Sequence, residues 1–189
     1  GVVAAAPAKE RGEISNPATP TPACDGRFVF VMFGNGDVAA FDFQGNAVWT
    51  RSLGKLKNQY GVSSSLTTYR GTLILQLDQG EAEAGHSKVI ALDSMTGKTA
   101  WESAPRPVGN SWTSPILINA AQRYQLITAA NPWVIAYDPA NGTEFWRAKV
   151  CGGEMTPSPA FGAGLVFTAI DAEKLTALRP DGSGDVTTN

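Results

Sequence analysis

The chain has 189 residues and a formal net charge of −2, and 17% of its residues are charged. This weakly acidic balance gives no global field that would attract nucleic acid or an anionic membrane surface, which excludes both as expected partners. No apolar run is long enough to cross a bilayer as a helix. The 20 glycines and 12 prolines favour a turn-rich β-protein of the kind found outside the cytoplasm.

Residues 1–16 are rich in alanine at first and mixed in charge later, and we expect a flexible leader or the remnant of a preceding unit. They hold no charged segment followed by an apolar core, as a signal sequence would. A mature exported protein would have lost its signal, so this observation does not exclude export.

Three later stretches repeat one pattern. They read VAAFDFQGNAVW at 38–49, VIALDSMTGKTAW at 89–101 and VIAYDPANGTEFW at 134–146. In each, an alternating strand leads to an Asp, which bonds to turn amides, and then to a Gly, which accepts positive φ. A second short strand ends in Trp. The aligned positions are Asp42, Asp93 and Asp138, then Gly45, Gly97 and Gly142, then Trp49, Trp101 and Trp146.

The tryptophans are 52 and 45 residues apart, a period typical of an array of β-units. With two strands before each repeat, the sequence predicts four-stranded antiparallel units at about 17–53, 60–105, 111–150 and 154–189. Such units arranged radially are β-propeller blades, so the predicted class is all-β, with about four blades. In the last unit Arg179 replaces the Asp and no Trp follows, so we expect that blade to be incomplete. The three Trp side chains are predicted to dock one blade on the next.

The pattern A-x-D-x-x-T-G-x-x-x-W, seen from Ala91 to Trp101, resembles the tryptophan-docking repeat of the pyrroloquinoline-quinone-type (PQQ-like) β-propellers. That family includes quinoprotein dehydrogenases and non-enzymatic BamB-like lipoproteins that scaffold outer-membrane protein assembly. The resemblance implies a ring of seven or eight blades, of which this chain would be a fragment, or a half completed by self-association. It also implies a periplasmic or otherwise exported bacterial protein.

Loops that link successive blades share one face of a propeller with the loops between second and third strands. On that face we expect aromatic, amide and acidic side chains to meet and to bind a protein, peptide or glycan. An alternative is that Trp112 and Trp133 cap the blade core. The binding-face candidates are Tyr60, Asn110, Trp112, Asn131, Trp133, Glu154, Met155 and Asp171.

Residues 78–87 form an insertion with the single histidine, His86. We interpret it as a solvated loop, with a cation or acid–base site as the alternative. Cys24 and Cys151 lie in non-adjacent blades, so we expect buried free thiols and neither a disulfide nor a zinc site.

No nucleophile–base pair or ligand cluster appears, so the sequence favours a non-catalytic binding module with no metal or cofactor. The alternative implied by the resemblance is a fragment of a PQQ- and calcium-dependent quinoprotein dehydrogenase. In that case Glu154, Asn131 and Asp171 are the side chains that we nominate for calcium.

Overall fold

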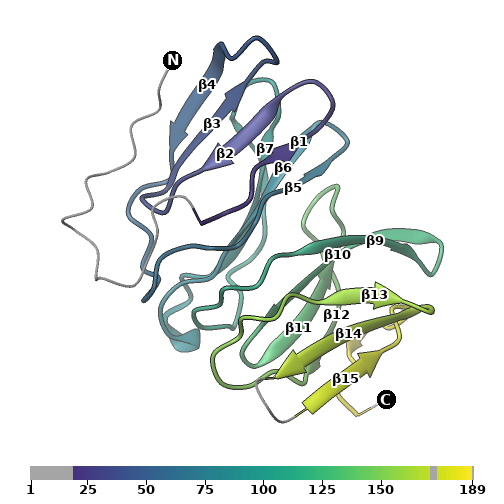
Figure 1. Ribbon diagram of the computed structural model, residues 1–189. Coiled ribbons are helices and arrows are strands. Elements are labelled where there is room, and N and C mark those ends of the chain that lie inside the picture. The colour runs from purple at the N-terminus through teal and green to yellow at the C-terminus, as the bar shows by residue number, and fades with distance from the viewer. Residues whose placement is uncertain (1–18, 171–173, 189) are drawn as a thin grey trace.

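A computed structural model describes residues 19–170 and 174–188, so the expected leader and Asp171 lie outside the described residues. The fold is an all-β partial propeller of four sheets arranged side by side (Figure 1). Among the described residues, the one helical element is a 3₁₀ turn, η2 (Ala82–Ala84). Within the described ranges, no helix has the length and apolar character needed to cross a membrane.

The first two sheets have the predicted four antiparallel strands in chain order. The first contains β1 (Ala23–Cys24), β2 (Val29–Met32), β3 (Asp37–Phe41) and β4 (Ala47–Ser52). The second contains β5 (Thr67–Tyr69), β6 (Thr72–Leu77), β7 (Lys88–Asp93) and β8 (Thr99–Glu102).

The last two sheets differ from the prediction. The third contains β9 (Ile116–Ala120), β10 (Arg123–Ala130), β11 (Trp133–Tyr137) and β12 (Glu144–Lys149), and the fourth contains β13 (Ala160–Gly162), β14 (Leu165–Ile170) and β15 (Lys174–Leu178). The final strand, β16 (Gly184–Asp185), does not extend the fourth sheet but pairs parallel with β12. The Val186 amide donates to the Arg147 carbonyl at 2.9 Å, and the Lys149 amide donates to the Thr187 hydroxyl at 2.9 Å. These bonds draw the C-terminal segment onto the edge of the third sheet.

The repeated turn forms because its Asp gathers local donors. Asp93 Oδ1 accepts hydrogen bonds from the Met95 and Thr96 amides at 3.1 and 2.9 Å and from the Thr96 hydroxyl at 2.7 Å. The Thr96 bonds stabilise the carboxylate and hold the pKa of Asp93 below its ordinary value. Gly97 then takes φ of 69°, which a side chain would disfavour.

A bulge after this turn places each tryptophan opposite an alanine. The pairs are Ala40–Trp49, Ala91–Trp101 and Ala136–Trp146. Because cross-strand partners share a face, each indole points from its own sheet toward the following one.

The tryptophan rings lie over the turn glycines of the next sheet. A Cβ atom added to Gly97 would lie 2.7 Å from the Trp49 ring, and one added to Gly142 would lie 2.5 Å from the Trp101 ring. The Trp49 indole N–H donates to the Ser94 carbonyl at 2.9 Å. Only a residue without a side chain allows so close an approach, which gives these glycines a packing role besides their conformational one. How much the contact stabilises the fold remains a prediction.

The core consists of three apolar layers, one between each pair of successive sheets. Trp49 packs at the edge of the first layer, Trp101 at the edge of the second, and Trp146 is fully buried in the third. The second and third sheets therefore bury side chains on both of their faces, and the first and fourth sheets bury them on one.

The two cysteines are unpaired and lie in different settings. Cys24 is exposed on β1, so the expectation of a buried thiol is wrong for this residue. Cys151 is partly buried in the link from the third to the fourth sheet, and burial raises its pKa to about 11.

Candidate functional site

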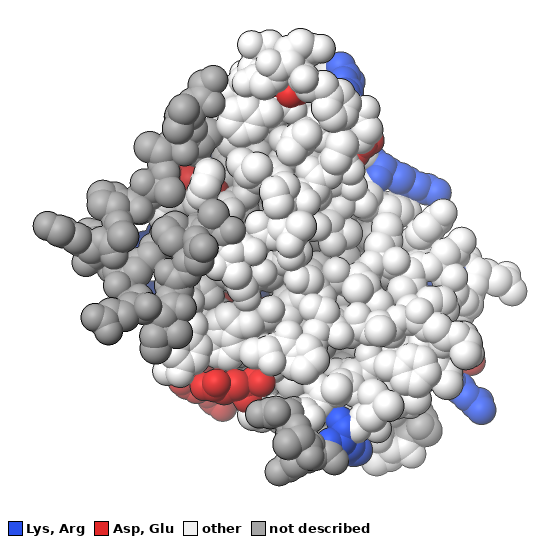
Figure 2. Space-filling model, viewed as in Figure 1, with Lys and Arg blue, Asp and Glu red and all other residues white. Residues whose placement is uncertain are grey.

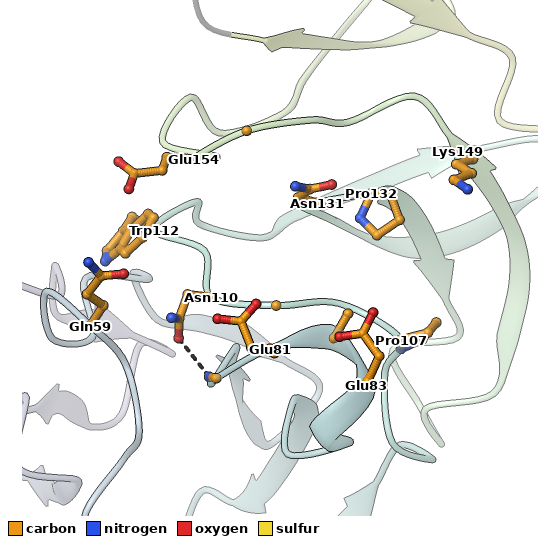
Figure 3. Close-up of a pocket in the computed structure, with 14 residues that line it drawn as sticks. Gln59, Glu81, Glu83, Pro107, Asn110, Trp112, Asn131, Pro132, Lys149 and Glu154 are labelled. Carbon is orange, nitrogen blue, oxygen red and sulfur yellow. Dashed lines mark hydrogen bonds between the residues drawn. The ribbon is translucent and has the colours of Figure 1, made fainter.

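A pocket of about 610 Å³ opens on the face where the linking loops meet the β6–β7 and β10–β11 loops (Figure 3). Trp112 and Glu154 lie at one end of it, and Lys149 lies at the other. Side chains from three successive sheets therefore share one concave surface. Those with polar or aromatic groups are Gln59, Glu81, Glu83, Asn110, Trp112, Asn131, Lys149 and Glu154.

The floor of the pocket is fixed by a backbone clamp. The Gly80 amide donates to Asn110 Oδ1 at 2.8 Å, and the Asn110 amide donates to the Gly80 carbonyl at 2.8 Å. The Asn58 side chain donates to the Asp78 carbonyl at 3.0 Å and to the Ser111 carbonyl at 3.3 Å. The β6–β7 loop and the link before β9 are thus held in one position, so the pocket is preformed.

Beneath this clamp lies a buried polar network. Arg106 and Asp78 form an ion pair with side chains 0% and 1% exposed. Arg106 also donates to the Tyr137 hydroxyl at 3.2 Å and the Thr128 hydroxyl at 2.9 Å, while the Ser111 hydroxyl donates to Asp78 at 2.5 Å. The network joins the second sheet to the third.

Burial alone would lower the pKa of Arg106, but Asp78 and Tyr137 outweigh it and raise that pKa above its usual value. Desolvation raises the pKa of the Tyr137 phenol, which therefore stays neutral. The pair fixes the loops above it and does not face the pocket. Sequence analysis missed Arg106, because an arginine between two prolines in a linking loop is usually exposed.

Trp112 lines the pocket and stacks on Tyr60, which lies beside it. The ring centroids of Trp112 and Tyr60 are 5.2 Å apart with an interplanar angle of 41°. The Trp112 amide donates to the Met155 carbonyl at 2.9 Å, and its carbonyl accepts from the Ser63 hydroxyl at 3.2 Å. Tyr60 is 37% exposed, so the pair offers an accessible apolar surface on a fixed backbone.

The electrostatics of the pocket are acidic. Glu81 and Glu83 lie at η2, Glu154 lies in the link before β13, and all three are exposed. Lys149 is the one basic residue among those that line the pocket. A compact acidic patch is visible near η2 at the lower left of the molecule (Figure 2).

The predicted binding face is brought together in part. Asn110, Trp112, Asn131 and Glu154 line the pocket, and Tyr60 stacks beside it. The sequence analysis interpreted the loop of Glu81 and Glu83 as solvated, with a cation or acid–base site as the alternative, and did not assign it to the binding face. The signal that could have found them is that the β6–β7 loop opens on the same face as the links.

Two further candidates, Met155 and Trp133, do not line the pocket. Met155 is wrong, because it is fully buried in the third apolar layer and cannot touch a ligand. Trp133 packs against the second apolar layer, with the Arg147 guanidinium 5.3 Å from its ring centroid. Asp171 lies outside the described residues.

The side chains nominated for calcium do not form a ligand set among the described residues. Glu154 and Asn131 both line the pocket, but no group of three or more His, Cys, Asp or Glu side chains gathers in the described ranges. Calcium requires six to eight oxygen ligands. Glu154 and Asn131 alone supply too few oxygen ligands for the ion, and no chemical step is assigned to calcium or quinone.

His86 lies away from this pocket. Its Nε2 is 3.5 Å from Lys57 Nζ, beside a separate hollow near β4 and β8. Within the described chain it has no carboxylate or thiol partner at hydrogen-bonding distance.

Comparison with solved structures shows the fold. BamB from Moraxella catarrhalis superposes with a TM-score of 0.62 at 17% identity, over 85% of this chain and 46% of its own. Quinohemoprotein alcohol dehydrogenase from Comamonas testosteroni gives 0.63 at 16% identity, over 91% and 34%. The computationally designed Ika4 protein gives 0.56 at 14% identity, over 89% and 93%. The chain thus spans under half of the two natural proteins.

No curated protein sequence matches the chain significantly. The family model described as outer membrane protein assembly factor BamB matches residues 9–112, which is more than half of the chain. This match agrees with the repeated Asp–Gly–Trp turns and with the arrangement of the sheets. The chain therefore belongs to the PQQ-like β-propeller family of the outer membrane protein assembly factor BamB.

Proposed function

We propose that this chain is a non-catalytic binding module whose loop-face pocket holds an extended, positively charged segment of a protein ligand. The observation that carries the proposal is that Glu81, Glu83 and Glu154 line the same fixed pocket as Trp112. Carboxylates attract lysine and arginine side chains. In an extended ligand, alternate side chains point to the same face, so their spacing can match the distances between the carboxylates of the pocket.

The aromatic pair supplies the second component. A lysine or arginine stem can pack along the Trp112–Tyr60 pair while its charged end stays near a carboxylate. Amide groups of Gln59 and Asn131, which line the same pocket, can donate to and accept from a ligand backbone. Rigid loops reduce the ordering cost of binding, because the clamp at Gly80 is already formed.

The family supports a protein ligand over a glycan. Its description names an outer membrane protein assembly factor, and such a role requires contact with other proteins. On the same basis we propose an exported, periplasmic location.

The proposal is tested with a fluorescein-labelled peptide of alternating lysine and threonine, followed by anisotropy at low and high salt. We expect saturable binding that weakens with salt, and about tenfold weaker binding for Trp112→Ala. Glu81→Gln combined with Glu83→Gln should also weaken binding by several-fold. Glu102→Gln is the matched control, because Glu102 is exposed on β8 away from the pocket.

Equal binding of an alternating glutamate–threonine peptide would contradict the proposed charge selection. Binding of a neutral oligosaccharide that depends on Trp112 and is insensitive to salt would instead assign the pocket to a glycan.

A further inference from the structure

A second hollow, of about 390 Å³, lies between the first and second sheets. It shares no lining residue with the loop-face pocket, and it carries charge of the opposite sign. Four basic residues line it, together with one carboxylate and the single histidine. They are Arg51, Lys55, Lys57 and Lys88, with Glu102 and His86. On a chain with a net charge of −2, this hollow is a local concentration of positive charge.

The arginine of this hollow is not required by the repeat. Arg51 stands two residues after the docking tryptophan of the first sheet, and the same position holds Ser103 in the second sheet and Ala148 in the third. Arg51 Nη1 donates to the Gly97 carbonyl at 2.8 Å, and Nη2 donates to the Thr99 hydroxyl at 2.9 Å. These bonds fix the guanidinium charge beside the hollow at this one junction between sheets.

A buried glutamine fixes the two loops that carry Lys57 and His86. Gln79 is 8% exposed; its Oε1 accepts from the Lys57 amide at 2.9 Å, and its Nε2 donates to the His86 carbonyl at 3.4 Å. The Gly80 amide donates to the Lys57 carbonyl at 2.8 Å. Because the backbone of both residues is held, their side chains meet in a preformed arrangement, with Lys57 Nζ 3.5 Å from His86 Nε2.

The basic groups outnumber the carboxylates that could neutralise them. Glu102 pairs with Lys88 at 2.9 Å and so offsets one lysine. Neither Lys55 nor Lys57 forms an ion pair with a carboxylate among the described residues, and both are exposed. An ammonium group has three donors and no acceptor, so its natural partner is an anion.

Apolar side chains complete the lining of the hollow. Leu77 and Ile90 are 1% and 2% exposed, and Leu53 and Leu56 are partly buried. Charges of one sign beside low-dielectric walls focus the potential and raise the local concentration of ions of the opposite sign. The hollow therefore attracts anions even though the chain as a whole does not.

We propose that this hollow binds the phosphate group of a small phosphorylated molecule or of a lipid headgroup. A phosphate group offers several strong acceptor oxygens, so Lys57 Nζ and His86 Nε2 can each donate to a different oxygen of the same group. Lysine binds phosphate as a point charge, whereas a carboxylate is matched best by the free fork of an arginine. Here lysines predominate, and both terminal nitrogens of Arg51 already bond to the second sheet.

The first experiment is a calorimetric titration of the chain with pyrophosphate at low salt. We expect saturable binding that weakens as salt is added. Lys57→Gln should weaken it about tenfold, because a charge-assisted hydrogen bond is lost. Lys174→Gln is the matched control: it changes the net charge equally, but Lys174 is exposed on β15 and does not line the hollow. The Lys57 side chain is exposed, so its variant should fold, which circular dichroism checks.

Glu102→Gln gives a change in the opposite direction. It removes the one carboxylate of the lining and frees Lys88 from its ion pair, so pyrophosphate should bind several-fold more tightly. A variant that merely disturbed the local structure would weaken binding instead.

Two further arms identify the source of the phosphate. Binding of glycerol phosphate in solution, with no affinity for vesicles, assigns the hollow to a small phosphorylated molecule. Co-sedimentation with phosphatidylglycerol vesicles that is lost in Lys57→Gln, and is absent with phosphatidylcholine, assigns it to a lipid headgroup.

The proposal fails on any of three results. The first is no saturation up to about 10 mM pyrophosphate. The second is equal weakening by Lys57→Gln and Lys174→Gln, which would reduce the effect to net charge. The third is equally tight binding of citrate, which would remove the preference for phosphate.

Discussion

Gly142→Ala tests whether tryptophan docking stabilises the array of sheets. The backbone at Gly142 has φ of 76°, so any side chain costs about 1–2 kcal/mol in strain. The new Cβ would also lie 2.5 Å from Trp101 Cε3, about 1 Å inside normal contact, and the displaced ring would cost a further 1–3 kcal/mol or so. Gly45 is the matched control: it holds the same turn position in the first sheet with φ of 82°, and nothing lies within 4 Å of an added Cβ.

The measurement is equilibrium urea unfolding followed by circular dichroism, with the free energy of unfolding compared between variants. Gly142→Ala should lose about 1–3 kcal/mol more than Gly45→Ala. In a Trp101→Ala background this excess should disappear, because the ring that the methyl group meets is gone. If the two glycine variants agree within about 0.5 kcal/mol, or the excess survives without Trp101, the docking contact does not stabilise the fold as reasoned.

Three further predictions concern buried polar groups. Trp49→Phe should lower the free energy of unfolding by about 1 kcal/mol more than Trp101→Phe. The Trp49 indole N–H donates to a carbonyl of the next sheet, whereas the Trp101 indole N–H has no partner among the described groups. Equal losses would contradict this reasoning. Arg106→Met should destabilise by about 3–5 kcal/mol in the same assay by leaving the Asp78 carboxylate buried and unpaired, whereas a loss under about 1 kcal/mol would show that water reaches the pair. With a pKa of about 11, raised from 9.0, Cys151 has about a hundredfold less thiolate at pH 8 than an unperturbed thiol. Its alkylation by iodoacetamide, followed by mass spectrometry, should therefore be slow in the folded protein and fast in urea. Equal rates would refute the burial argument.

The architecture was accessible from the sequence because its signal is local and repeated. An Asp that caps its own turn, a Gly at positive φ and a Trp at a fixed distance are separated by only a few residues, so their spacing survives whatever surrounds them. Asp93, Gly97 and Trp101 show this in the second sheet. The path of β16 could not be read in the same way, because its pairing with β12 joins residues almost forty positions apart and leaves no periodic mark.

The candidate site was less accessible, since it depends on which way side chains point after the sheets assemble. Asn110 and Trp112 were found from their place in a link, which fixes the face but not the orientation. Met155 occupies an equivalent link and turns inward to fill the third apolar layer. Arg106 was missed for the converse reason: a distant carboxylate, Asp78, draws a linking-loop residue into the interior.

The parallel strand β16 has a consequence for how the molecule opens. Sheets that contact only their neighbours behave as a one-dimensional chain of coupled units, in which the terminal unit separates at the lowest free energy. By crossing back to β12, the C-terminal segment makes the fourth sheet and the third partly one cooperative unit. Hydrogen exchange should then release these two sheets together, whereas the first sheet, which no such strand joins to its neighbour among the described residues, should open independently.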